Sequence, residues 1–448
     1  MKTRVASAVI SAFIVLLFNS CVQNDSSSKM NTALVVAAMV PPCDASAPYP
    51  SYYQLTLNLD DYSNHYELGL DYGSQILTLV PNYEEIVDWY LKIVSVLVPY
   101  ESLRDRAVEI KDGDQIPEDY QEEIDGLASV CTGTEDKAGD GKLSINEVYM
   151  LQLLPDIFVS TQCSSVSVFG ASSDTGHTII GRNLEWFAGF PHNYLSLLQA
   201  VVTIKNAAPY DVCLIGYLGF IGCITGFNNQ GLFGSIHVSD ADKSLYDATG
   251  KGSYNMNLRY TLENYNSVST AGNYLTTLDS TDYAAGHLFD LADPDEAQVF
   301  EYDPGPPVNK GIREWDSTLR GGVTLFDHDY TIGAVNSCVL PGFYDNHRGN
   351  NVSRWDHMKE QLDKKFGDIG TPDTVTVNEL KDVITNFQGR KPGAVDGDLY
   401  RGYIQQTFIY QPGLDLAKAE VHFHPLCDQS PGVPGDTDFF VIVKAAFD

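Results

Sequence analysis

Residues 163–186 read CSSVSVFGASSDTGHTIIGRNLEW. After Cys163, small and β-branched residues alternate, which predicts the start of a strand. The Ser-Ser-Asp-Thr-Gly run that follows is typical of a turn, and the residues leading to Arg182 predict a returning strand. Such a hairpin brings the Arg182 guanidinium beside the Cys163 thiol. A neighbouring cation lowers the pKa of a thiol and so increases its nucleophilic thiolate form. The alternative is a buried structural cysteine beside an ordinary ion-paired arginine.

The composition indicates a globular protein and argues against a nucleic-acid partner. The chain has 448 residues, of which 44% are hydrophobic and 19% charged, as in a globular protein with a sizeable core. Its formal net charge is −31. Such a charge would repel the phosphate backbone, so we expect no nucleic-acid partner. Strong acidity suits acidic or extracellular fluid, where protonation of carboxylates reduces self-repulsion.

The N-terminus has the pattern of an export signal. Basic residues precede a short apolar run that ends near Cys21, so residues 1–21 are interpreted as a signal peptide. Cys21 after Ser20 also permits a bacterial lipoprotein signal. Residues 22–42 are expected to form a flexible linker, and the mature protein to be secreted or lysosomal. Export permits disulfides, whose pairing stays open among Cys43, Cys131, Cys213, Cys223, Cys338 and Cys427.

Periodicity divides the remaining chain near Cys163. Residues 53–59 alternate like a strand, whereas 82–98 and 117–130 carry apolar residues at helical spacing. Another helix should begin at Ser144, where a capping-box pattern occurs, and end near Pro155. Beyond Cys163 the sequence is mostly strand-like. We therefore expect an α+β protein whose first part is largely helical.

One segment is similar to a calcium-binding loop. Asp136, Asp140 and Glu147 occupy acidic positions of an EF-hand pattern. Ala138 replaces another expected ligand, and the capping box already accounts for Glu147. The segment is a weak calcium candidate; we otherwise expect no metal and no cofactor.

The residues around Cys163, taken with later segments, resemble the acid ceramidase and N-acylethanolamine acid amidase family. This family groups with choloylglycine hydrolases and penicillin V acylases among the N-terminal-nucleophile (Ntn) hydrolases. The resemblance covers most of residues 43–425. Its motifs include Gly-Phe-Ile-Gly-Cys-Ile-Thr-Gly-Phe at 219–227, Gly-Leu-Phe at 231–233, Val-Asn-Ser at 335–337, and Arg354.

The resemblance implies a fold and a maturation step. It implies a four-layer αββα sandwich of two antiparallel sheets, with a helical N-terminal subunit at 43–162 and a catalytic subunit at 163–448. The precursor, a zymogen, is expected to cut itself between Gln162 and Cys163, and the fragments to stay associated. The new α-amine of Cys163, with an ordinary pKa near ~7.7–8.0, could then act as general base without a histidine.

The resemblance also implies residue roles and substrates. It assigns Cys163 as nucleophile and base, Arg182 as the cation beside it, Asn336 as an oxyanion donor and Arg354 as a second arginine of the site. Glu185 stands where the family has aspartate. The implied substrates are N-acyl lipids of the ceramide or N-acylethanolamine type, with a membrane surface or lipid-presenting protein as a further partner.

Some features depart from the family. Arg182 and Glu185 are three residues apart, so a regular strand places them on opposite faces, and a bulge is required if both face the thiol. The family's Asn-Glu-Arg segment is replaced by Val238-Ser239-Asp240, after His237. These departures leave the choice of substrate open.

Several alternative functions remain. They are an acyltransferase, an acylase of the penicillin V or bile-salt type, a phospholipase-B-like hydrolase, a papain-like protease and a binding protein without activity.

Overall fold

A computed structural model describes residues 43–44, 49–158, 162–189, 193–239, 246–366, 374–412, 419–427, 441–443 and 447. The predicted signal peptide and linker, and Asp240, lie outside these residues. The strands are β1 (Tyr53–Asn58), β2 (Gln162–Val168), β3 (Ile179–Glu185), β4 (Gln199–Lys205), β5 (Val212–Tyr217), β6 (Thr225–Asn228), β7 (Phe233–Val238), β8 (His287–Ala292), β9 (Ala297–Asp303), β10 (Asn309–Arg313), β11 (Thr331–Ala334), β12 (Ile404–Tyr410), β13 (Ala419–Phe423) and β14 (Val441–Val443). The α-helices are α3 (His65–Leu79), α4 (Tyr83–Val94), α5 (Tyr100–Lys111), α6 (Glu118–Ala128), α7 (Ile145–Gln152), α8 (Leu154–Ile157), α9 (Tyr254–Asn264), α10 (Val268–Asn273), α11 (Asn350–Asp363) and α12 (Val377–Ile384).

The predicted hairpin at Cys163 is confirmed. Strands β2 and β3 pair antiparallel, with Cys163 opposite Leu184 and Ser165 opposite Arg182. Since alternate residues of a strand share a face, Cys163, Ser165 and Arg182 project from the same side of this hairpin.

Two sheets form the body of the molecule. One has the strand order β1-β4-β5-β6-β7-β8-β9-β10 and the other β11-β2-β3-β12-β13-β14. The prediction of antiparallel sheets fails at one pair, because β1 runs parallel to β4. Strand β1 belongs to the N-terminal part and reaches the sheet through a long connection, so no hairpin turn fixes its direction. The mixed α+β class is confirmed.

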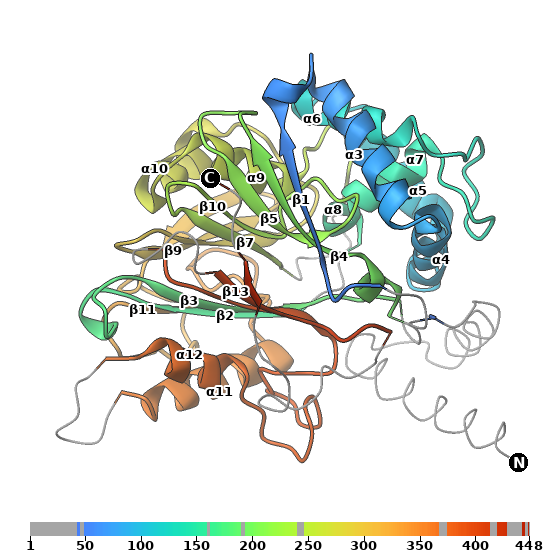
Figure 1. Ribbon diagram of the computed structural model, residues 1–448. Helices are drawn as coiled ribbons and strands as arrows, with labels where there is room; N and C mark the ends of the chain where they lie inside the picture. Colours follow the sequence, from blue (N-terminus) through green and yellow to red (C-terminus); the bar gives the residue numbers. More distant parts are fainter. Residues whose placement is uncertain are drawn as a thin grey trace, which may run out of the picture.

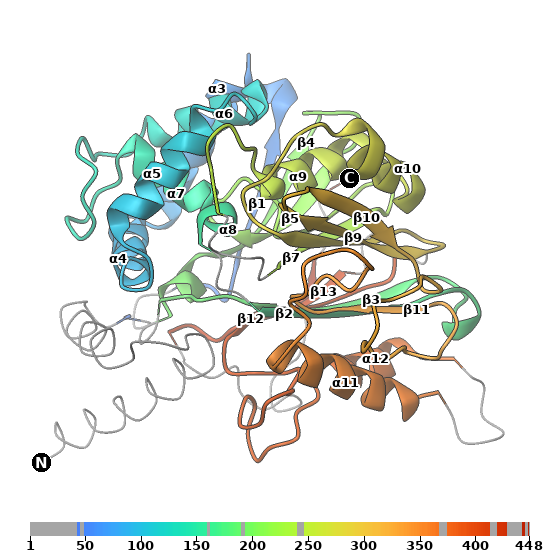
Figure 2. The ribbon, with the colours of Figure 1, turned by 180° about the vertical axis from the view of Figure 1, so that it is seen from behind.

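Helices cover the outer faces of both sheets (Figure 1). Helix α9 packs on β6 and β7 of the larger sheet, and α12 packs on β2 and β3 of the smaller one. Apolar residues fill the space between the sheets, where the Phe233 and Phe408 rings stack with centroids 5.4 Å apart. Seen from behind, α11 and α12 lie below the smaller sheet, and α9 and α10 beside the larger one (Figure 2).

The N-terminal helices α3–α7 gather at one end of the larger sheet (Figures 1 and 2). The helices predicted at 82–98 and 117–130 correspond to α4 and α6, and the Ser144 capping box opens α7. Helix α3 was not predicted, since two glycines interrupt its pattern. Both allow close approach to α6: a Cβ on Gly69 would lie 2.1 Å from the Glu123 carbonyl oxygen.

The predicted end of the helix after Ser144 is wrong in detail. Helix α7 ends at Gln152, and Pro155 lies in the first turn of the short helix α8. Proline is tolerated there because the first N–H groups of a helix have no intrahelical acceptor.

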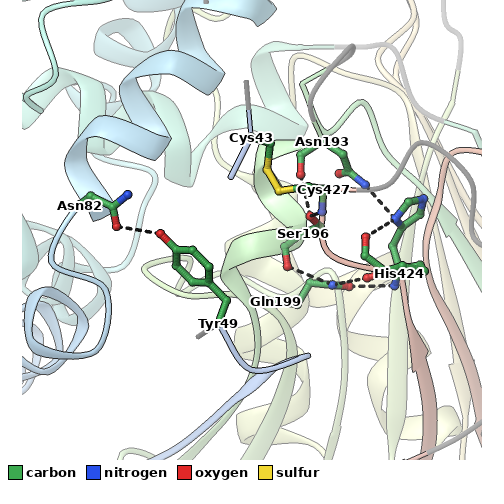
Figure 3. Close-up of a disulfide and its surroundings, with 9 residues drawn as sticks. Cys43, Tyr49, Asn82, Asn193, Ser196, Gln199, His424 and Cys427 are labelled. Atoms are coloured by element: carbon green, nitrogen blue, oxygen red, sulfur yellow. Dashed lines mark hydrogen bonds between the residues drawn. A yellow bond between two sulfur atoms is a disulfide. The ribbon is translucent and has the colours of Figure 1, made fainter. Parts of the chain in front are cut away.

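A disulfide joins Cys43, the first described residue, to Cys427, which follows β13 (Figure 3). Beside it, the Cys427 N–H donates to Ser196 Oγ at 2.8 Å, and Tyr49 OH donates to Asn82 Oδ1 at 3.1 Å. The other candidates are free thiols: Cys131, Cys213, Cys223 and Cys338.

Candidate active site

Cys163 lies near the start of β2 with 1% of its surface exposed. Its thiol is 3.8 Å from Arg182 Nη2. Burial raises the pKa of this thiol above its ordinary value, although Arg182, the Glu185 N–H and Arg354 all act to lower it. Arg182 therefore lowers the pKa of the thiol, as expected, but the effect of burial is larger and the net shift is upward.

Arg182 connects the two sheets at the site. From β3 it donates through Nη2 to the Ile236 carbonyl oxygen at 2.7 Å, and through Nη1 to Thr225 Oγ1. Both partners belong to the facing sheet. The guanidinium is 1% exposed, and burial lowers its pKa. Three sets of contacts therefore fix the position of this cation relative to the Cys163 sulfur.

Asn336 contacts the backbone nitrogen of Cys163. Its Oδ1 accepts from the Cys163 N–H at 2.5 Å and from Arg354 Nη2 at 3.0 Å, and its Nδ2 donates to the Val238 carbonyl oxygen at 2.7 Å. These partners fix the orientation of the amide, because two donors face Oδ1 and an acceptor faces Nδ2. Asn336 thus holds the backbone nitrogen of Cys163, the residue that the sequence predicts to follow the cleavage site. Its role as an oxyanion donor stays a prediction.

Arg354, from α11, contacts the carbonyl side of Cys163. Its Nη1 donates to the Cys163 carbonyl oxygen at 2.5 Å and to Ser164 Oγ at 3.2 Å, and its Nη2 also reaches Asn351 Oδ1 at 2.8 Å. Arg354 is fully buried, and burial lowers its pKa to about 10. The Asn351 amide, part of an N-glycosylation sequon, is thereby engaged inside the site.

Glu185 lies on the other face of the hairpin from Arg182. It pairs with Gln162 across the strands, and strand alternation gives these two a common face. Arg182 and Glu185 thus lie on opposite faces, as their spacing predicts for a regular strand, and the β2–β3 register has no bulge. A register shift occurs instead where β12 pairs with β3, between Ile404 and Gln406. Burial raises the pKa of Glu185, while Arg401 and Arg354 lower it. The structure thus places the other four predicted site residues close to Cys163, with Arg182 and Glu185 on opposite faces of the hairpin.

A histidine–aspartate pair lies on the thiol side of the hairpin and was missed as a functional pair. His237 Nε2 contacts Asp290 Oδ2 at 2.6 Å and Ser165 Oγ at 3.1 Å. Both contacts use the same ring nitrogen, so the group lacks the Ser-His-Asp relay geometry, in which the two partners use different nitrogens. His237 and Asp290 come from adjacent strands β7 and β8, and no local sequence pattern links them.

The calcium candidate residues accept hydrogen bonds from protein groups, within the loop and from helix α5. Asp136 accepts from Ser144 Oγ at 2.7 Å and Asn146 Nδ2 at 2.9 Å, and Glu147 accepts from Tyr100 OH at 2.6 Å. Asp140 accepts from the Lys142 N–H at 3.1 Å. Within the described ranges, no group of three or more His, Cys, Asp or Glu side chains is arranged to hold a metal ion.

In the part of the chain that the structure describes, no helix has the length and apolarity needed to span a membrane. No known family model matches the sequence, and no curated protein matches it.

Solved structures that are similar include an N-acylethanolamine-hydrolyzing acid amidase ortholog from Caenorhabditis elegans, with 12% identity, a TM-score of 0.39, and coverage of 57% of this chain and 94% of that one. A mutant conjugated bile acid hydrolase from Clostridium perfringens has 15% identity and a TM-score of 0.35, covering 58% and 89%. A penicillin V acylase from Agrobacterium tumefaciens has 12% identity and a TM-score of 0.36, covering 58% and 83%.

Proposed function

We propose that the protein is an Ntn amidase that cuts itself between Gln162 and Cys163 and then hydrolyses N-acyl amides. One observation carries this proposal: separate buried side chains contact the sulfur, the nitrogen and the carbonyl oxygen of Cys163. These side chains are Arg182, Asn336 and Arg354. A merely structural cysteine does not require its backbone nitrogen and carbonyl to be held by a buried amide and a buried guanidinium.

Self-cleavage begins when the Cys163 sulfur attacks the carbonyl carbon of Gln162. A C–S bond forms, the C–N bond breaks, and the nitrogen of Cys163 takes up a proton to become an amine. Water then hydrolyses the thioester, which leaves a carboxylate on Gln162 and restores the thiol. Asn336 holds the nitrogen during this change, and the Arg182 cation stabilises the sulfur as negative charge develops on it.

Hydrolysis of a substrate repeats the same chemistry with an external amide. The free α-amine of Cys163 takes the thiol proton and passes it to the leaving amine. The acyl group stays on sulfur as a thioester until water releases it as an acid. The site thus needs no catalytic histidine, and His237 is not assigned a proton-transfer role.

The N-acyl lipid substrate and a lipid-presenting partner rest on the sequence resemblance alone. Secretion or lysosomal residence rests also on the signal-peptide pattern of residues 1–21. We propose ceramides and N-acylethanolamines for the first substrate panel. Penicillin V and bile-salt conjugates belong in the same panel, together with a phospholipid ester and an amine acceptor that detects acyl transfer. Continued association of the two fragments is supported by the disulfide between Cys43 and Cys427.

Mass analysis of the purified protein tests the proposal. We expect a fragment that begins at Cys163, and Cys163→Ala should stay uncut and inactive. Cys131→Ala is the matched control, since Cys131 is a free thiol outside the site, and it should be cut and active. An intact wild-type chain with full amidase activity would overturn the mechanism, because it has no α-amine at Cys163.

A further inference from the structure

The side chain of Gln162 is held by two donors on the face of the hairpin opposite the thiol. Its Oε1 accepts from Asn350 Nδ2 at 2.8 Å and from Arg401 Nη1 at 2.8 Å. Asn350 is itself fixed, because its Oδ1 accepts from the Gly397 N–H at 3.2 Å. The two donors come from the start of α11 and from the residues before β12. Together they form a binding site for one acceptor oxygen.

Gln162 is the acyl half of the first amide that Cys163 cleaves. The Gln162 carbonyl carbon lies where the carbonyl carbon of a substrate acyl group must lie to react with the sulfur. The position of Gln162 Oε1 therefore shows where such an acyl group can place an oxygen that accepts a hydrogen bond. Once the Gln162–Cys163 bond is broken, this residue is no longer joined to Cys163. A substrate acyl group must then present its carbonyl to the same sulfur.

We propose that Arg401 and Asn350 form an acyl-specificity subsite that selects substrates with an oxygen acceptor on the acyl chain. The spacing is that of the glutamine side chain itself, which a glutaryl or glutaramyl group reproduces. This inference rests on the proposed amidase function and narrows its substrate class. It differs from the N-acyl lipid of the sequence resemblance, because a plain fatty acyl chain has no oxygen that could accept from these two donors.

The charges around the subsite favour an acceptor of negative or partial negative charge. The guanidinium of Arg401 and that of Arg354 both act on Glu185, whose pKa they lower against the effect of burial. Two cations thus accompany one carboxylate on this face. The other acidic neighbour of Arg401 is the exposed Asp396, at 3.9 Å. A substrate carboxylate could therefore form a charge-assisted hydrogen bond with Arg401.

The test compares amides of one chromogenic amine carrying glutaryl, glutaramyl or pentanoyl groups. With the cut wild-type enzyme, we expect kcat/KM for the first two to exceed that for pentanoyl by about 10- to 100-fold, the effect of a charge-assisted hydrogen bond. Arg401→Gln should lower the ratio of kcat/KM for the glutaryl amide to that for the pentanoyl amide by about 10- to 100-fold. Arg390→Gln is the control, since Arg390 is exposed and its replacement removes the same charge.

Arg401 also holds Gln162 in the uncut chain, so its replacement can slow maturation. Inhibition of cut wild-type enzyme by free glutarate and free pentanoate gives a second measurement that needs no variant. Stronger inhibition by glutarate is expected. Equal inhibition, or equal hydrolysis of all three amides, would overturn the subsite and leave the amidase function in place. Failure of the cut enzyme to hydrolyse any N-acyl amide would overturn both.

Discussion

At the scale of single residues, the site shows how burial and charge compete at Cys163. Burial raises the pKa of the thiol, and three neighbouring groups reduce that rise. Burial therefore works against formation of the nucleophilic thiolate. If the chain cuts itself as proposed, the free α-amine of Cys163 would add the base that the buried thiol otherwise lacks.

Arg182 is the first residue to test. Arg182→Ala should lower hydrolysis at least about 100-fold, because no cation then contacts the sulfur. It should also destabilise the protein by about 1–3 kcal/mol, since the Ile236 carbonyl oxygen and Thr225 Oγ1 lose their buried donor. Lysine should restore activity only in part, because an ammonium cannot reproduce the guanidinium fork.

Thr225→Val provides the matched control for Arg182. It removes one partner of the guanidinium but leaves the cation beside the sulfur. Activity should stay close to wild type when kcat/KM and thermal unfolding are measured side by side. Wild-type turnover in Arg182→Ala would show that the hairpin arginine is structural.

Asn336 can be tested in a way that separates two roles. Asn336→Asp keeps an oxygen acceptor for the Cys163 N–H and for Arg354 Nη2, but loses the Nδ2 donor. If Asn336 serves to hold the nitrogen, self-cleavage should be slowed more by Asn336→Ala than by Asn336→Asp. If Nδ2 also stabilises the oxyanion, both variants should lower turnover by roughly 10²–10³.

The two Asn336 variants are followed by timed gels for self-cleavage and by kcat for hydrolysis. Equal rates of self-cleavage in wild type and Asn336→Ala would contradict a role in holding the nitrogen. Equal turnover would contradict the role in oxyanion stabilisation.

At the scale of elements, the local sequence pattern predicted those helices and strands whose formation depends on neighbouring residues. The Cys163 hairpin, α4, α6 and the Ser144 capping box follow from alternation, helical spacing and cap chemistry. Helix α3 could not be predicted in this way, because its glycines are explained only by the approach of α6. The parallel pairing of β1 with β4 and the contacts of Asn336 and Arg354 are long-range. Only the family resemblance indicated those two site residues.

The contact between α8 and the start of α9 should contribute to stability in a pH-dependent way. Asp156 of α8 accepts from Ser253 Oγ at 2.7 Å, the Tyr254 N–H at 2.8 Å and Asn255 Nδ2 at 2.7 Å. Burial raises the pKa of this carboxyl to about 7, although these bonds lower it. The folded chain then keeps a proton that the unfolded chain loses near an ordinary pKa of ~3.9. This group's contribution to stability is full below about pH 4 and is lost as pH rises to about 7.

Asp156→Asn should remove that pH dependence, because its side chain stays neutral throughout the window. Urea unfolding in the uncut Cys163→Ala background gives the free energy of unfolding of a single chain at several pH values. The difference between Asp156 and its Asn variant should change between about pH 4 and pH 7. Asp140→Asn, at an exposed position, controls for the loss of one charge. A difference that is constant with pH would contradict the raised pKa.

At the scale of the whole molecule, cleavage at Gln162 would divide a structure whose parts remain connected. Arg259 of α9 donates to Glu123 of α6 at 2.5 and 2.9 Å, and all these groups are buried. Strand β1 pairs with β4 across the same division. The disulfide between Cys43 and Cys427 adds a covalent link between the two proposed fragments.

That link determines how self-cleavage must be observed. A denaturing gel without reductant should show one band even for fully cut protein, because the fragments ending at Gln162 and beginning at Cys163 remain joined through Cys43 and Cys427. Reductant should release two bands. Cys43→Ser should give two bands without reductant. In native buffer its fragments should still co-elute, held by the β1–β4 pairing and the buried Arg259–Glu123 pair. Separation of the Cys43→Ser fragments in native buffer would show that the disulfide alone holds them together. A single band from wild type under reducing conditions would mean that the Gln162–Cys163 bond is intact.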